Sequence, residues 1–190
     1  MSTSNLFEET YEGVKFTNDT LRNVMYEVCE FRNCSFAGVN FIEVVFEECN
    51  FESCDFTGAH LNETAFRDAN FLECKMIGLN FENINTFQLK FSFDQTLLDY
   101  ASFYKLMIKG TQFENCSLKG CDFTNTDIRN GGFSGSNLID AVFDQTILLK
   151  ADFRTSLDYS INPGKNQLKG AKFSREGIDG LLHEFGISID

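Results

Sequence analysis

The sequence predicts an all-β solenoid made of five-residue units. Large apolar residues recur at every fifth position over most of the chain, and this period fits neither an α-helix nor a flat strand. It does fit a chain in which each unit is one short extended side followed by a turn. The first series runs from Tyr11 to Phe91, with Thr86 as its one member that is not large and apolar, and the second series, shifted by two residues, runs from Phe93 to Phe153.

A second inward position accompanies the first. The residue two places before each large one is mostly small or β-branched, and residues two apart along an extended segment point to the same side. The two residues after each large one are mostly polar, which places them in the turn. Glycine recurs there at Gly38, Gly58 and Gly78, as expected where a turn needs positive φ.

These units resemble a known repeat. Cys54–Gly58, Ala69–Glu73 and Ala151–Thr155 are similar to the A-(D/N)-(L/F)-x-x unit of pentapeptide-repeat proteins, and the resemblance covers roughly residues 6–173. It implies a right-handed quadrilateral parallel β-helix with four units in each coil. Residues twenty apart then stack at about 4.8 Å. The expected core columns are Phe31, Phe51 and Phe71; Phe36 and Phe56; and Phe103, Phe123 and Phe143.

No catalytic or metal-binding chemistry is expected. All seven cysteines occupy the small inward position, which predicts packing residues, because zinc ligands must converge on one point. The two histidines, His60 and His183, belong to no catalytic motif, and a filled solenoid offers no obvious pocket. We therefore predict a protein that is not an enzyme and that needs no cofactor.

The first residues and the cysteine content bear on location. Residues 1–15 contain no apolar stretch of the kind found in signal peptides, and no run of about 18 apolar residues occurs. Seven cysteines without an export signal suit a reducing compartment. A cytoplasmic location and no membrane association are the resulting expectations.

Two interruptions divide the repeat region, which we expect to span residues 1–173. The phase slips by two residues near 82–92, which needs a bulge or a short insertion. This slip is either a tolerated defect or a local feature used in recognition. The repeat is also irregular near 158–166, where Asp158 and Pro163 stand at positions that normally carry large apolar residues.

Residues 174–190 have a different pattern, which predicts a short C-terminal α-helix. Ser174 is a candidate N-cap, Gly186 is a candidate C-cap, and Ile187–Ile189 is expected to be a short strand. The helix either caps the open end of the rod or forms a homodimer. Residues 181–187 resemble the C-terminal end of Qnr-type quinolone-resistance proteins, and Ile161–Pro163 resembles the microcin-immunity branch. The resemblance implies dimerisation through Ile178, Leu181, Leu182, Phe185 and Ile187.

The charge points to a function. The chain has a net charge of −12, and residues 1–91 carry fifteen Asp and Glu against six Lys and Arg. Such a protein repels nucleic acid and attracts basic surfaces. Stacking at twenty residues predicts an acidic face made of Glu27, Glu43, Glu47, Glu48, Glu63 and Asp68.

Three explanations of this charge are open. The family resemblance implies a DNA mimic that binds DNA gyrase or topoisomerase IV and protects it from quinolones or toxins. The alternatives are a general protein-interaction scaffold with an unrelated partner, and acidity that serves solubility alone.

Overall fold

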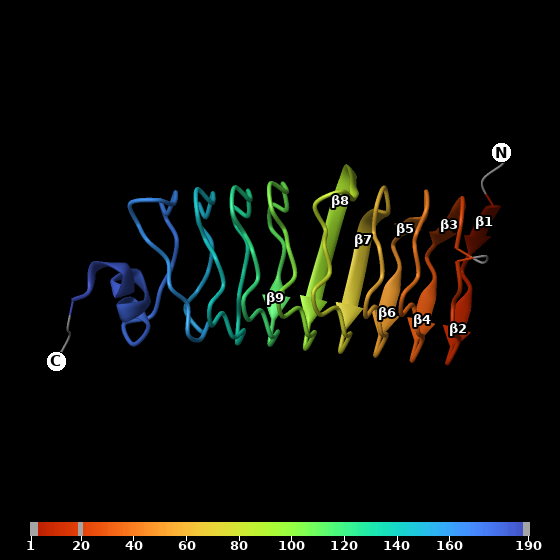
Figure 1. Ribbon diagram of the computed structural model, residues 1–190, viewed down its shortest axis with the longest axis horizontal. Coiled ribbons are helices and arrows are strands. Elements are labelled where there is room, and N and C mark those ends of the chain that lie inside the picture. Colours follow the sequence, from red (N-terminus) through yellow and green to blue (C-terminus); the bar gives the residue numbers. More distant parts are fainter. Residues whose placement is uncertain (1–3, 19–20, 188–190) are drawn as a thin grey trace.

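The computed structural model describes residues 4–18 and 21–187 and has the shape of a rod. Coils stack along its length, and the two ends of the chain lie at opposite ends of the rod (Figure 1). Every strand pairing within the described ranges is parallel. The predicted fold class, a parallel β-helix with four sides to each coil, is confirmed.

Two adjacent faces carry the regular strands. Face A consists of β1 (Ser4–Phe7), β3 (Val24–Glu27), β5 (Val45–Glu47) and the first part of β7 (Ala65–Leu72). Face B consists of β2 (Thr10–Glu12), β4 (Glu30–Arg32), β6 (Asn50–Glu52), the second part of β7 and β9 (Phe113–Glu114). The long strands β7 and β8 (Asn85–Asp94) run around the corner between the two faces, so they join both into one sheet.

Faces C and D are held by single parallel bridges. On face C, Ser35 pairs with Asp55, and on face D, Asn40 pairs with His60. In these sides and in most of the second half of the rod, each extended segment is too short to count as a strand. The coils still follow one another at the same twenty-residue step, as in the pairing of Asp127 with Ile147 on face A.

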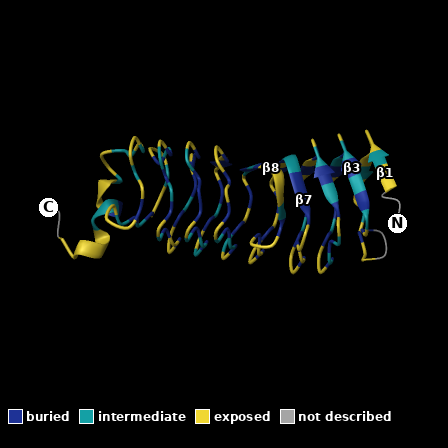
Figure 2. Ribbon diagram, turned by 90° about the horizontal axis from the view of Figure 1, so that it is seen from above, coloured by how far each residue is buried: buried dark blue, intermediate teal, exposed yellow. Residues whose placement is uncertain are grey.

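The interior is a set of aromatic columns. Behind face B, successive rings stack with centroids 4.6–5.3 Å apart and planes within 13° of parallel. In Figure 2, segments coloured as buried recur in successive coils along the rod. Because each ring contacts one above and one below, the column excludes water along the whole axis. The column contains Tyr11, Phe31, Phe51, Phe71, Phe93, Phe113, Phe133, Phe153 and Phe173.

The small inward position has a second role besides packing. The seven cysteines are all buried and free. The Cys49 thiol donates to the carbonyl of Tyr26 at 3.4 Å, and the Thr126 hydroxyl donates to the carbonyl of Phe103 at 2.8 Å. Burial raises the pKa of the Cys49 thiol to about 12 and likewise that of Cys116. These side chains are therefore protonated donors that satisfy backbone groups inside the core.

The corners use the left-handed backbone conformation. Gly38, Gly58 and Gly78 have φ of 68–69°, as the turn pattern predicts. Most corners, however, place a residue with a side chain in this conformation, including Glu48 at φ 53° and Asp68 at φ 60°. The corner is therefore a source of backbone strain, since this region disfavours side chains by about 1–2 kcal/mol per residue.

The phase slip is a bulge on face A. Phe71 pairs with Phe93, which is 22 positions later, and the register shifts on either side of Arg67. The two extra residues leave Phe91 and Phe93 both buried and expose Phe87, a residue that is 64% accessible. Core packing is therefore maintained across the break, and the irregularity appears on the outer surface.

The C-terminal segment differs from the prediction. It contains two 3₁₀ turns, η1 (Ile178–Leu181) and η2 (His183–Phe185), and no α-helix lies within the described residues 174–187. The Ser174 hydroxyl accepts the Gly177 N–H at 3.0 Å, and Gly186 ends η2 at φ 61°. The reason is close packing: a Cβ on Gly180 would lie 2.6 Å from the Tyr159 ring, so the chain is pressed against the end of the rod.

In the irregular region near residues 158–166, the residues that occupy the core differ from those of the regular repeat. Tyr159 and Ile161 are buried there, and Asp158 is exposed. Asn166 occupies the small inward position and donates to the carbonyl of Phe143 at 2.9 Å. The proposed strand Ile187–Ile189 extends beyond the described residues. None of the helices in the described ranges has the length and apolar character that a membrane span requires.

Candidate partner-binding surface

The six acidic residues singled out from the sequence surround face A. Glu27 pairs in register with Glu47 on the outer side of the face. Glu43 and Glu63 stand at the corner with face D, and Glu48 and Asp68 stand at the corner with face B. The coil geometry therefore brings all six to one side of the rod and its two edges.

Basic residues interrupt this set. The column of Glu27 and Glu47 continues with Arg67, whose Nη1 lies 2.9 Å from Glu47 Oε2. Lys90, from the bulge, binds the carboxylate of Asp68. Glu43, Glu48 and Glu63 are exposed and form no ion pair with any residue of the described ranges. Face A is therefore not a continuous acidic ladder.

Farther along the rod, the sign of face A reverses. Lys109 and Arg129 flank Asp127, whose side chain is only 10% accessible. Burial alone would raise the pKa of Asp127, but the hydrogen bonds and charge of Arg129, with Lys109 behind them, hold that pKa below its ordinary value. The carboxylate is therefore ionised at neutral pH and neutralises only one of the two cations.

Face B carries a second acidic column that the sequence analysis missed. Glu52, Asp94 and Glu114 project from its outer side in one column, and Leu72 occupies the coil between Glu52 and Asp94. The sequence signal for this column is a step of twenty residues from one coil to the next, which becomes 22 residues across the phase slip. Asp94 accepts from the Asn115 amide at 3.3 Å, and Glu52 lies 3.6 Å from Arg32.

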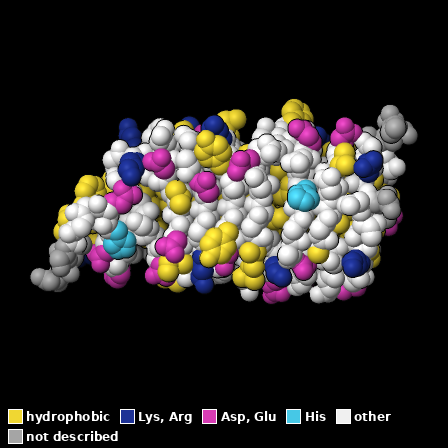
Figure 3. Space-filling model, in the orientation of Figure 1, with side chains coloured by type: hydrophobic (Ala, Val, Ile, Leu, Met, Phe, Trp, Pro, Cys, Tyr) yellow, Lys and Arg dark blue, Asp and Glu magenta, His cyan; other side chains and the backbone are white. Residues whose placement is uncertain are grey.

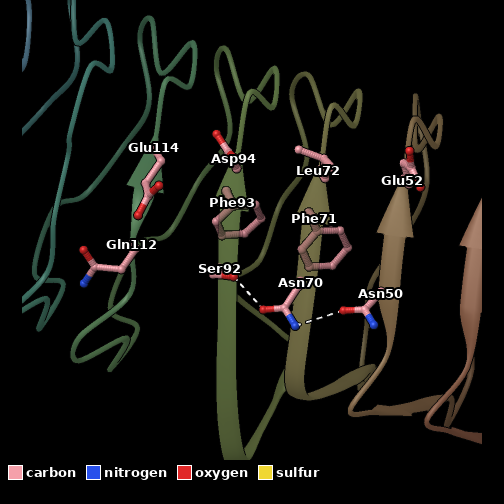
Figure 4. A pocket seen from close by; sticks show the side chains of 10 residues that line it. All are labelled: Asn50, Glu52, Asn70, Phe71, Leu72, Ser92, Phe93, Asp94, Gln112 and Glu114. Carbon is pink, nitrogen blue, oxygen red and sulfur yellow. Dashed lines mark hydrogen bonds between the residues drawn. The ribbon is translucent and has the colours of Figure 1, made fainter.

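A shallow groove of about 530 Å³ runs between this column and a row of amides and hydroxyls (Figure 4). The Asn70 amide donates to Asn50 Oδ1 at 3.1 Å, and the Ser92 hydroxyl donates to Asn70 Oδ1 at 2.6 Å. The aromatic rings Phe71 and Phe93 lie beneath the strands that form its floor. Polar groups fixed on a rigid sheet suit recognition of another macromolecule, because they lose little freedom on binding.

The rest of the surface is mixed in charge. On the face seen in Figure 3, acidic and basic side chains are interspersed along the rod. Across the described residues, no group of three or more His, Cys, Asp or Glu is arranged to hold a metal ion. The features that stand out are therefore the acidic positions of face A in the N-terminal half and the acidic column of face B.

The five residues expected to form a dimer are divided by the fold. Leu181 packs against the core, and Leu182 is half-buried. Ile178, Phe185 and Ile187 remain exposed, with accessibilities of 49%, 55% and 57%. The segment therefore covers the end of the rod and still presents an apolar edge. Pairing of two copies through that edge stays a prediction.

Comparisons with known proteins identify the repeat region. The family model described as a pentapeptide repeat region matches residues 24–103 and 44–123, and an eight-copy pentapeptide repeat model matches residues 108–145. No curated protein matches the chain.

Several solved structures share the fold. One trypsin-treated variant of QnrB1, a plasmid-mediated fluoroquinolone resistance protein, has a TM-score of 0.74 at 18% identity, covering 96% of this chain and 99% of its own. A second such variant has a TM-score of 0.64 at 16% identity, covering 98% and 100%. HetL, involved in heterocyst differentiation regulation in the cyanobacterium Nostoc, has a TM-score of 0.61 at 16% identity, covering 93% and 89%.

Proposed function

Since the chain belongs to the pentapeptide-repeat family, we propose that it is a non-enzymatic rod that binds a type II topoisomerase as a mimic of DNA. The observation that carries this proposal is the repetition of exposed carboxylates at coil spacing on a rigid surface. Glu52, Asp94 and Glu114 on face B are the main contacts. Glu48, exposed at the corner between faces A and B, adds negative charge beside them. The partner is DNA gyrase or topoisomerase IV.

The charge density is compatible with this role. Eight coils at about 4.8 Å give a rod of roughly 40 Å. A DNA duplex of that length carries roughly 24 charges, since B-DNA has one per about 1.7 Å. The chain has a net charge of −12. It thus offers about half the charge of DNA, in a fixed arrangement, to a basic channel that normally holds a duplex.

The expected consequence is protection of the enzyme. A protein that occupies the DNA-binding surface of a topoisomerase displaces DNA that is held with a quinolone or a toxin. The shared fold with QnrB1, which is a fluoroquinolone resistance protein, is in keeping with this proposal. The shared fold with HetL, a protein of differentiation regulation, favours the second candidate function, a scaffold for an unrelated protein.

A supercoiling assay separates the two functions. Purified gyrase is assayed with and without ciprofloxacin, at low salt, with the protein added at micromolar concentration. We expect either relief of ciprofloxacin inhibition or direct inhibition of supercoiling. The double variant Glu52→Lys/Glu114→Lys should lose most of the effect, whereas Asp140→Lys, an exposed reversal in the second half of the rod, should retain it. No effect of the wild-type protein on gyrase, or on topoisomerase IV in a matching relaxation assay, would contradict the topoisomerase proposal and favour the scaffold function.

A further inference from the structure

Face A carries more apolar outward side chains than faces B and D. In each coil, one outward residue precedes the large core residue. On face A this residue is polar at Asn5, Asp127 and Gln167, and it is apolar in five coils, which form an interrupted apolar column of Met25, Val45, Ala65, Met107 and Ile147. Within this column Met107 is 63% exposed, whereas Ala65 is buried. The corresponding positions are polar on face B, as in Asn50 and Asn70, and on most of face D, as in Asn40 and His60.

The charges on face A and its two corners change sign along the rod. The first four coils contribute mostly carboxylates and the next four mostly cations. The acidic members are Glu8, Glu27, Glu43, Glu47, Glu48, Glu63 and Asp68, with Arg67 among them, and the basic members are Lys90, Lys105, Lys109, Arg129 and Lys150, with Asp127 among them. A surface with acid at one end, base at the other and an apolar column between them is complementary to itself when turned end over end.

We propose that face A docks on face A of a second copy of this chain, with the two rods antiparallel. The two-fold axis runs along the strand direction, in the plane of the interface. Such an isologous contact repeats every pairing twice. It also sets the acidic end of each copy against the basic end of the other, which favours association and fixes the register.

One register pairs most of the acidic positions with basic ones and sets Val45 against Met107, although Met25 then faces Asp127. It places the coil of Val45 opposite the coil of Met107, and the coil of Met25 opposite the coil of Asp127. The coil of Asn5 then lies opposite the coil of Ile147, and the coil of Ala65 lies opposite the coil of Asn85. The charged pairs it forms are Glu47 with Lys109, Glu27 with Arg129, Glu8 with Lys150, Glu43 with Lys105 and Asp68 with Lys90. The apolar pairs are Val45 with Met107 and Phe7 with Leu149.

The exposed ring of Phe87 also has a place in this register. It lies opposite Arg67 of the second copy, and Arg67 already lies 5.4 Å from the Phe87 ring centroid within one chain. The bulge therefore adds a cation–π contact near the two-fold axis. The size is adequate as well, because eight coils of about 4.8 Å and sides of roughly 16 Å give about 600 Å² per copy, near the roughly 800 Å² of a standard interface.

The dimer would also enlarge the acidic surface of face B. This consequence rests on the proposed function. A two-fold axis along the strands keeps the corner between faces A and B on the same side in both copies. The two B faces then lie side by side, and their acidic columns form one wider surface. A partner with a basic channel would therefore meet carboxylates from both copies.

Charge exchange tests the interface. Sedimentation equilibrium at about 50 mM salt, where exposed charges are weakly screened, should show a wild-type dimer. Glu47→Lys alone and Lys109→Glu alone should each weaken the dimer at least tenfold. The double variant Glu47→Lys/Lys109→Glu should restore it, since the two reversed charges face each other across the axis. Glu52→Lys on face B is the matched control and should leave the dimer intact.

Cysteine cross-linking tests the register. Each native cysteine is buried, so introduced thiols are the reactive ones. Val45→Cys/Met107→Cys should form an intermolecular disulfide under mild oxidation. Val45→Cys alone should not, because its counterpart in the second copy is about three coils away, well beyond the limit of roughly 7 Å between Cα atoms.

Three results would overturn the proposal: a monomeric wild-type protein at about 100 μM and low salt, a dimer unaffected by both single reversals, or cross-linking by Val45→Cys alone, which indicates parallel rods. A dimer that is lost only with Leu182→Asp/Phe185→Asp would assign the interface to the C-terminal segment. None of these measurements uses a topoisomerase. A negative result for dimerisation is therefore independent of a negative result for topoisomerase binding.

Discussion

Arg67 Nη1 lies 2.9 Å from Glu47 Oε2, and the two residues are in register on adjacent coils. This ion pair ends the run of carboxylates on face A. It also supports the bulge, because the same guanidinium lies over the Phe87 ring, 5.4 Å from the ring centroid. A single basic residue thus connects the acidic surface, the phase slip and the exposed aromatic side chain.

Replacing Arg67 by Gln should make the rod less stable and its surface more acidic. The side chains of Arg67 and Glu47 are 23% and 32% accessible, so loss of the pair should lower the free energy of unfolding by about 1 kcal/mol. Urea denaturation measures this change. Lys119→Gln, which removes an exposed cation that forms no ion pair within the described residues, is the control and should be near neutral. Equal effects of the two variants would contradict a structural role for the pair.

Phe51→Ala should strongly destabilise the rod. The Phe51 ring is sandwiched between Phe31 and Phe71 with centroids 4.8 Å away on both sides, and its residue is 1% exposed. Removing it leaves a cavity, which lowers the free energy of unfolding by about 3–5 kcal/mol. Phe87→Ala is the matched control, since that ring is exposed and should contribute about 1 kcal/mol or less. Thermal unfolding followed by circular dichroism distinguishes the two.

The thiols should be inert in the native protein and should make stability fall at alkaline pH. Burial raises the pKa of Cys49 and of Cys116 from the ordinary thiol value of 9.0 to about 12. Between those values the unfolded chain loses protons that the folded chain keeps, so stability is full below about pH 9 and decreases above it.

Two measurements check the thiols. A chromogenic thiol reagent at pH 8 should label none of the seven cysteines until denaturant is added. The urea midpoint should fall between pH 9 and pH 10.5, and the fall should be smaller in Cys49→Ala. Rapid labelling of the native protein would show that the interior is open, which would contradict the filled core.

Gly180→Ala should detach the C-terminal segment. A Cβ there would lie 2.3 Å from the Tyr159 carbonyl oxygen, which is backbone and cannot move aside easily. We expect faster proteolysis of residues 174–187 and exposure of the last aromatic ring of the core, Phe173. Gly78→Ala is the control, because that position has positive φ but open space around it. If both variants resist proteolysis equally, the close packing of Gly180 is not what holds the segment.

Much of the fold is readable from the sequence because five-residue periodicity acts locally. A large residue such as Phe51 and a small one such as Cys49 point inward for the same stereochemical reason in every unit. Stacking then follows from the fixed number of residues in a coil. The face B acids were overlooked because the two-residue slip moves Asp94 and Glu114 out of the twenty-residue count that starts from Glu52.

The sequence by itself determined which side chains enter the core, since that depends only on alternation within an extended segment. Only the tertiary structure decided which charges meet across the bulge. Lys90 reaches Asp68, 22 positions earlier, because the bulge shifts the register locally, and no periodic rule describes that shift. Likewise, residues 178–185 have helical spacing, but Gly180 is pressed against Tyr159, and steric contact between distant parts of the chain overrides local propensity.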